Sequence, residues 1–257
     1  MAWAKFPYPD DKYHYTAASL KKAWARLHAC DAEPFPKDAA LVEAWIAFHA
    51  GDFEKAAKLG LEQGMDGYTV ANKATNIYAH YLEKSEKKKL ALFLEVAERC
   101  EAQQKEQPKN PAAYYNHAYS LGRYSQGISV VKALSQGLGS KIKNSLDMTI
   151  KLAPKHADAL ISLGAYHAEI IDKVGAMIGG LTYGAKKDEG LKFYKKALEA
   201  NPHSAIGRVE YANGLIMLEG KKKMDDAVKL YHEAAECEPM DAMERLDVEL
   251  AKQELED

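Results

Sequence analysis

The spacing of hydrophobic and polar residues predicts helices along most of the chain. Between residues 16 and 107, apolar side chains recur about every three to four positions in about four to five segments, which places them on one face of a helix. Gly51 and Asp52 fit a tight turn between two of these helices, and Ser85 is placed to cap the long helix that follows. Residues 1–15 lack this spacing and are rich in proline, tyrosine and aspartate, so we expect an extended arm there.

From Pro108 onward the pattern repeats. Three predicted helices end at a proline, and three residues after each of Pro108, Pro154 and Pro202 a new helix is predicted. These new helices have a small residue near the middle: Ala118, Gly164 and Ala212. Their partner helices have small residues seven positions apart with a tyrosine between: Gly190, Tyr194 and Ala197, and Ala227, Tyr231 and Ala234. Small side chains let two backbones approach closely, so the pattern predicts repeating helical hairpins.

This pattern resembles the tetratricopeptide repeat (TPR), whose unit of about 34 residues is a pair of antiparallel helices followed by a proline. The resemblance implies an all-α, right-handed α-α superhelix of about 12–14 helices, forming a single domain over residues 1–257. Within it we expect N-terminal helices with one divergent repeat over 1–107, three hairpins over 108–239 and a capping helix over 240–257. Because Val248 and Leu255 fall off the apolar stripe of that last helix, we expect its final turn to fray.

Two of the hairpins are longer than a TPR unit. The interval from Pro108 to Pro154 is 46 residues, that from Pro154 to Pro202 is 48, and that from Pro202 to Pro239 is 37. Because the helices align at both ends of each interval, the extra residues must lie between the two helices of a hairpin, at 126–139 and 170–186. Both segments are apolar and glycine-rich, unlike ordinary loops, so we expect something to cover them. For the apolar part of the second, a short buried helix and an element that dips into a membrane surface both fit.

Glycine-rich insertions of this kind are similar to those of a narrower branch, the T-component proteins of TPR-associated TRAP transporters (TatT) and the related regulator of microtubule dynamics proteins. The likeness covers the chain from about Pro111 and rests on four stretches: 163–167, 175–184, 191–202 and 247–256. It implies a solenoid that docks a partner protein and, in the transporter branch, holds or passes an apolar or amphiphilic small molecule. The chain departs from that branch, because T-components are lipoproteins with an early cysteine, whereas the first cysteine here is Cys30, inside a predicted helix.

Charge and cysteine usage narrow the classes of partner and compartment. A formal net charge of -2 and a pI near 6.5 give no overall basic field, which argues against nucleic acid or an anionic membrane as the main partner. The three cysteines are far apart and form no CxxC pair, which is typical of reduced thiols. No secretory signal and no membrane-spanning apolar stretch is visible, so we expect a cytoplasmic protein.

Motifs for catalysis or metal binding are missing from the sequence. The nine histidines include no H-E-x-x-H and no pair at positions i and i+4. The glycines between 175 and 184 do not form a phosphate loop, because Ala185 stands where that motif requires lysine. A cysteine and a histidine that meet only in space stay an open alternative. We expect no catalytic residues, no metal and no cofactor.

The tyrosines predict a binding surface. In TPR folds the first helices of the hairpins line a concave groove, and the resemblance places nine residues there: Tyr115, Tyr119, Arg123, Ile161, Ala165, Glu169, Val209, Asn213 and Met217. Aromatic and arginine side chains beside small residues suit an extended peptide or an amphiphile, although tyrosines can also simply pack helix against helix. We therefore expect a non-catalytic adaptor or scaffold that binds a protein or peptide in this groove. The alternative is a TatT-like carrier of an apolar or amphiphilic ligand, in a cavity roofed by segments 126–139 and 170–186.

Overall fold

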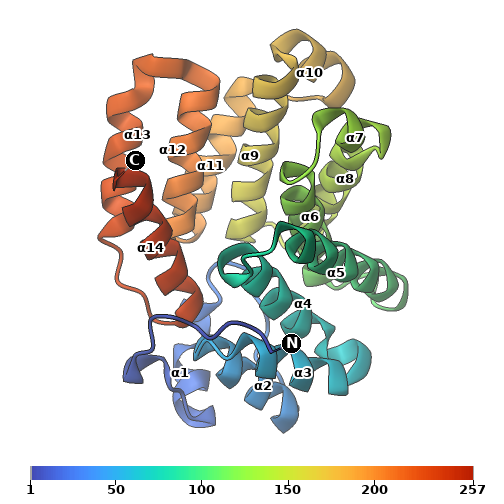
Figure 1. The fold of residues 1–257 in the computed structure, drawn as a ribbon, viewed down its shortest axis with the longest axis vertical. Helices are drawn as coiled ribbons and strands as arrows, with labels where there is room; N and C mark the ends of the chain where they lie inside the picture. The colour runs from blue at the N-terminus through green and yellow to red at the C-terminus, as the bar shows by residue number, and fades with distance from the viewer. Residues whose placement is uncertain (1, 257) are drawn as a thin grey trace. The chain divides into compact units, whose positions relative to one another are not determined.

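A computed structural model describes residues 2–256, and within that range every regular element is a helix (Figure 1). The end residues 1 and 257 of the predicted arm and capping helix lie outside the described range. The helices cluster in two compact units. Unit 1 comprises the chain up to His28, Glu33–Leu152 and Met240–Met243, and unit 2 comprises Ala29–Ala32, Ala153–Pro239 and the chain from Glu244. The single domain expected over residues 1–257 stays a prediction.

Unit 1 contains eight of the α-helices and the start of a ninth. These are α1 (Ala17–Leu27), α2 (Ala39–His49), α3 (Phe53–Glu62), α4 (Tyr68–Ile77), α5 (Glu86–Glu106), α6 (Pro111–Gln126), α7 (Val130–Ser135) and α8 (Leu138–Leu152), with the short turns η1 (Asp11–Tyr13), η2 (Gly64–Gly67) and the π-helix η3 (Tyr78–Leu82). Consecutive helices from α2 to α6 pack on one another, and α6 packs on α8. The predicted turn at Gly51 and Asp52 is present, and the Asp52 carboxylate caps α3. Ser85 stands at the start of α5, but its side chain makes no capping hydrogen bond, so that expectation is wrong.

Helix α4 is enclosed on all sides, and its polar side chains are hydrogen-bonded within unit 1. Every residue from Thr69 to Ile77 is buried. Arg99 on α5 donates from Nε to Asn72 Oδ1 at 2.8 Å and from Nη2 to Thr75 Oγ1 at 3.1 Å. Such bonds offset the cost of removing polar groups from water and fix the register of α4 against α5.

A short segment from the end of the chain completes unit 1. The Asp241 carboxylate lies 2.6 Å from His49 Nδ1, and both side chains are about 1% exposed. The hydroxyl of Tyr15 donates to the Met240 carbonyl oxygen at 2.8 Å. The segment Met240–Met243 is therefore held by a buried polar pair as well as by packing.

Unit 2 contains two of the three hairpins that the proline spacing predicts. Its helices are α9 (Ala157–Val174), α10 (Ala176–Tyr183), α11 (Lys187–Ala200), α12 (Ala205–Glu219), α13 (Met224–Ala235) and most of α14 (Ala242–Glu256), with the turn η4 (Gly220–Lys223). Helices α6, α9 and α12 begin three residues after a proline, and the side chains of Asn110, His156 and Ser204 cap them, which confirms the predicted starts.

The centre of unit 2 depends on one large side chain between two glycines. The ring of Tyr194, about 1% exposed, lies where a Cβ on Gly164 would come within 2.8 Å of it and where a Cβ on Gly214 would overlap it. Helices α9, α11 and α12 can pack together only because these two positions have no side chain. The role predicted for Gly164 is confirmed.

The end of unit 2 is more ordered than the sequence suggested. Val248 is 3% exposed and belongs to a core cluster with Val209 and Tyr231, and Leu255 packs against the same cluster. The expectation that the last turn of α14 frays is wrong, because Val248 and Leu255, which fall off the predicted stripe, both pack against this cluster. Cys30 also differs from expectation: it follows α1 in a turn and is buried there.

The two insertions form short helices whose apolar side chains are exposed. On α10 the exposed fractions are 76% for Met177, 53% for Ile178 and 85% for Leu181, and on α7 Val131 is 77% exposed. A buried helix for the second insertion is therefore wrong. Gly175 and Gly184, both with positive φ, begin and end α10. Among the described residues no helix is both long enough and apolar enough to cross a bilayer, and the cytoplasmic location stays a prediction.

Candidate binding sites

One candidate site is the face of α6 that carries Tyr115, Tyr119 and Arg123. The four-residue spacing places the three side chains in a row. The ring centroids of Tyr115 and Tyr119 are 6.1 Å apart, and the guanidinium carbon of Arg123 lies 5.4 Å from the centroid of Tyr119. Arg123 also donates to Gln126 Oε1 at 3.2 Å. The cation–π contact between Arg123 and Tyr119 holds the arginine side chain along the helix, so the row is preorganised.

The π-helix η3 adds His80 to this face. The His80 ring lies 6.3 Å from the ring of Tyr119, nearly perpendicular to it, and 4.2 Å from that of Tyr81. Burial lowers the pKa of His80 well below its ordinary value, and the positive charges of Arg123 and Lys89 add to this effect. The imidazole is therefore neutral near pH 7, and its Nε2 has no hydrogen-bond partner among the described residues. His80 could not be predicted as part of this face, because no pattern in the sequence links η3 to α6.

The six groove residues predicted in unit 2 differ from those on α6. Ile161 is 5% and Val209 1% exposed, and Val209 contributes to the core cluster with Tyr231. Asn213 accepts a hydrogen bond from the Tyr231 hydroxyl at 2.5 Å.

The other three keep part of their surface. Glu169 is partly exposed and pairs with Lys173 at 2.9 Å, Ala165 is half-buried, and Met217 is 38% exposed. Since three of the nine residues belong to unit 1 and six to unit 2, a single nine-residue groove stays a prediction.

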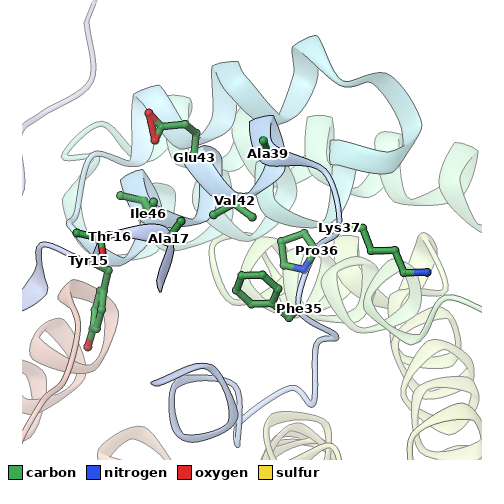
Figure 2. Close-up of a pocket in the computed structure, with 10 residues that line it drawn as sticks. All are labelled: Tyr15, Thr16, Ala17, Phe35, Pro36, Lys37, Ala39, Val42, Glu43 and Ile46. Atoms are coloured by element: carbon green, nitrogen blue, oxygen red, sulfur yellow. The ribbon is translucent and has the colours of Figure 1, made fainter. Parts of the chain in front are cut away.

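A second candidate site is a cavity of about 560 Å³ in unit 1 (Figure 2). Its walls come from the residues before and at the start of α1, from the loop before α2, and from α2 itself: Tyr15, Thr16, Ala17, Phe35, Pro36, Lys37, Ala39, Val42, Glu43 and Ile46. Figure 2 shows Val42 facing Phe35 and Pro36, while the charged ends of Lys37 and Glu43 point away from the apolar centre. A volume of this size suits a side chain or a small apolar ligand. Neither insertion contributes to its lining.

Two reactive groups outside these sites, His117 and Cys100, are buried. His117 Nδ1 is 2.8 Å from the Ser145 hydroxyl, and burial lowers the pKa of His117 although Glu101 opposes the shift. Burial raises the pKa of the Cys100 thiol, so this sulfur is not a thiolate at neutral pH. No group of three or more potential metal ligands occurs between residues 2 and 256.

Comparison with known proteins supports the fold at the level of the repeat. No protein-family model matches the chain, and no curated protein matches it. Among solved structures, it is similar to the crystal structure of a thermophilic TPR protein of Thermus thermophilus, with a TM-score of 0.57 and 16% sequence identity over 83% of this chain and 97% of that one. The fold is therefore all-α and TPR-like, as predicted, while the TatT branch finds no support in these comparisons.

Proposed function

We propose that the chain is a non-catalytic TPR-like scaffold that binds a protein or peptide partner through the α6 face. The observation that carries the proposal is the row of Tyr115, Tyr119 and Arg123, held by a cation–π contact on the first helix of a hairpin. Tyrosine and arginine contribute most of the free energy at protein interfaces, and side chains that are already ordered lose little entropy on binding. Tyr119 and Arg123 are half-buried, so each keeps surface for a partner.

The chemistry of this face favours an extended peptide over a folded globular surface. The ring of Tyr119 and the guanidinium of Arg123 lie next to each other and can each pack against a side chain of an extended segment, whereas Tyr115 is buried beneath them. His80 adds an imidazole that burial keeps neutral near pH 7, next to the ring of Tyr119.

The proposal is tested with Tyr119→Ala and Arg123→Ala. The partner is first captured from native lysate with the unchanged protein and then purified, so that its affinity is measured directly by calorimetry. Each substitution should weaken binding about tenfold or more, which is typical of central interface residues, with little change in the thermal midpoint. Tyr114→Ala is the matched control, because Tyr114 lies on the same helix but its hydroxyl donates to the Pro108 carbonyl oxygen at 3.2 Å. Unchanged affinity together with a large loss of stability would assign Tyr119 and Arg123 to packing.

A second candidate function, the TatT-like carrier, has support from the inserted helices. Helix α10 presents Met177, Ile178 and Leu181 with no charged residue from Val174 to Ala185, a composition that suits an apolar or amphiphilic ligand. Native mass spectrometry of the gently purified protein separates the two candidates. A reproducible small-molecule adduct supports the carrier, and a spectrum of protein mass alone favours the scaffold.

A further inference from the structure

The segment that precedes η1 lies on unit 1 as an extended peptide. Residues 2–10 have no helix, as the sequence predicted for the arm, and the dark blue start of the chain in Figure 1 ends near α3 and α4. The indole of Trp3 stacks on the ring of Tyr78, with centroids 4.1 Å apart and planes 15° from parallel. The Trp3 amide donates to Glu54 Oε2 at 3.0 Å, and the Ala4 amide approaches the Tyr78 hydroxyl at 3.4 Å.

A second point of attachment lies at Phe6, three residues after Trp3, where the segment meets a glycine of unit 1. Gly51, with φ of +85°, forms the turn between α2 and α3, and a Cβ there would come within 2.6–2.8 Å of the Phe6 side chain. The turn therefore leaves room for an aromatic ring only because position 51 is a glycine. Phe6 also meets the rings of Tyr8 and Tyr13 edge-on, at 5.9 and 6.2 Å.

The aromatic residues of the segment contact unit 1, and exposed residues separate them. Trp3, Phe6 and Tyr8 are half-buried, while the residues between them are exposed, namely Ala4, Lys5 and Pro7. The backbone amides donate to side chains of unit 1, a carboxylate and a phenol, and these acceptors do not depend on which residue supplies the amide. A site of this kind recognises an extended backbone and the spacing of two aromatic rings.

The residues that receive the segment are fixed independently of it. Glu54 pairs with Lys58 at 3.0 Å, and its pKa is lowered first by this bond and then by the Trp3 amide. The hydroxyl of Tyr78 donates to Glu83 Oε2 at 3.0 Å, and Tyr78 begins the π-helix η3, an irregularity that is frequent at functional sites. We call the surface of Gly51, Glu54 and Tyr78 the arm site.

We propose that the arm site is a peptide-docking site, occupied here by the chain's own Trp3–Phe6 segment. It would accept from another polypeptide an extended segment with a tryptophan three residues before a phenylalanine. A tethered segment has an effective concentration of about millimolar, so the arm limits access and a partner binds when the arm is weakened or outcompeted. The arm site shares no residue with the α6 face, and the two proposals can fail separately.

The test uses the full chain with Trp3→Ala and Phe6→Ala, which removes both rings from the tethered segment. The probe is a fluorescent synthetic peptide with the sequence of residues 2–14, and its anisotropy is measured during titration. The double variant should bind the probe at least about tenfold more tightly than the unchanged protein, because the tethered competitor is lost. A probe carrying the same two substitutions should not bind.

A matched pair of substitutions on α3 locates the binding. Added to the double variant, Glu54→Ala should weaken the probe's affinity, because the acceptor for the Trp3 amide is lost, whereas Glu62→Ala, at an exposed position of the same helix, should leave it unchanged. If the double variant melts cooperatively and binds the probe no better than the unchanged protein, the proposal is overturned.

The single variant Trp3→Ala guards against a folding artefact, because the Trp3 side chain is only half-buried. If this variant also fails to fold, the segment is a structural part of unit 1, and the proposal is likewise overturned.

Discussion

Helices α10 and α11 are neighbours in the chain, but large apolar side chains are exposed on α10 and buried on α11. In α11, Tyr194 is about 1% exposed and lies between glycines of two other helices. In α10, Leu181 is 85% exposed although the helix has no charged residue at all. The difference shows that apolar composition does not decide burial in this chain. A helix is buried where another helix offers small residues opposite its large ones, and α10 meets no such surface in its own unit.

The largest expected effect tests the packing of α9 against α11. Gly164→Leu places a branched side chain where Tyr194 already lies, so the two helices must separate or Tyr194 must leave its position. Overpacking of this kind costs about 1–3 kcal/mol or more of unfolding free energy. Chemical denaturation followed by circular dichroism measures it.

Gly122→Ala is the matched control for that substitution. Gly122 lies within helix α6, but a Cβ there would meet nothing within 4 Å. Alanine should therefore leave the stability unchanged or raise it by about 0.5–1 kcal/mol, because alanine favours the helix. Equal losses at Gly122 and Gly164 would show that the contact with Tyr194 does not decide the effect.

The regular hairpins could be predicted from the sequence because their determinants are local. A proline, a capping residue and a small residue at fixed spacing indicate where α9 and α12 begin and which face they bury, and the structure confirms this for Gly164 and Tyr194. Helix α10 was not predictable in the same way. Its run of apolar residues is the same whether a partner surface exists or not, and only the structure shows that unit 2 leaves it exposed.

Contacts between distant parts of the chain were also beyond the sequence. His49 and Asp241 are 192 residues apart, and the bond from Trp3 to Glu54 spans 51. Neither pair belongs to a motif or a periodic pattern, and each depends on how several helices pack. Of the nine predicted groove residues, Tyr115, Tyr119 and Arg123 could be placed in a row from the sequence because one helix supplies all three, and their role in binding stays a prediction.

A smaller effect is expected from pH, at two histidines of unit 1. The pKa of His80 lies well below 6.5 and that of His117 is also lowered, in both cases chiefly by burial. Below about pH 6.5 the unfolded chain binds protons at these imidazoles before the folded chain does, so stability should be fully present above that pH and fall as the pH decreases toward the folded-state pKa values. Denaturation at pH 7.5 and 5.5 should show a smaller loss for His117→Asn than for the unchanged protein. Parallel pH profiles would show that His117 does not contribute.

The smallest effect on stability is expected for the exposed side chains of α10. Leu181→Ser on α10 replaces a side chain that is already 85% exposed, so the unfolding free energy should change by no more than about 0.5 kcal/mol. Leu163→Ser is the matched control, because Leu163 on α9 is 2% exposed and its truncation should lower the unfolding free energy much more than the same change at Leu181. Retention on a hydrophobic-interaction column measures the exposed apolar surface. Leu181→Ser should elute earlier than the unchanged protein, because the substitution reduces the apolar surface of α10. If Leu181→Ser were as destabilising as Leu163→Ser, α10 would be part of the packed core of unit 2 in solution.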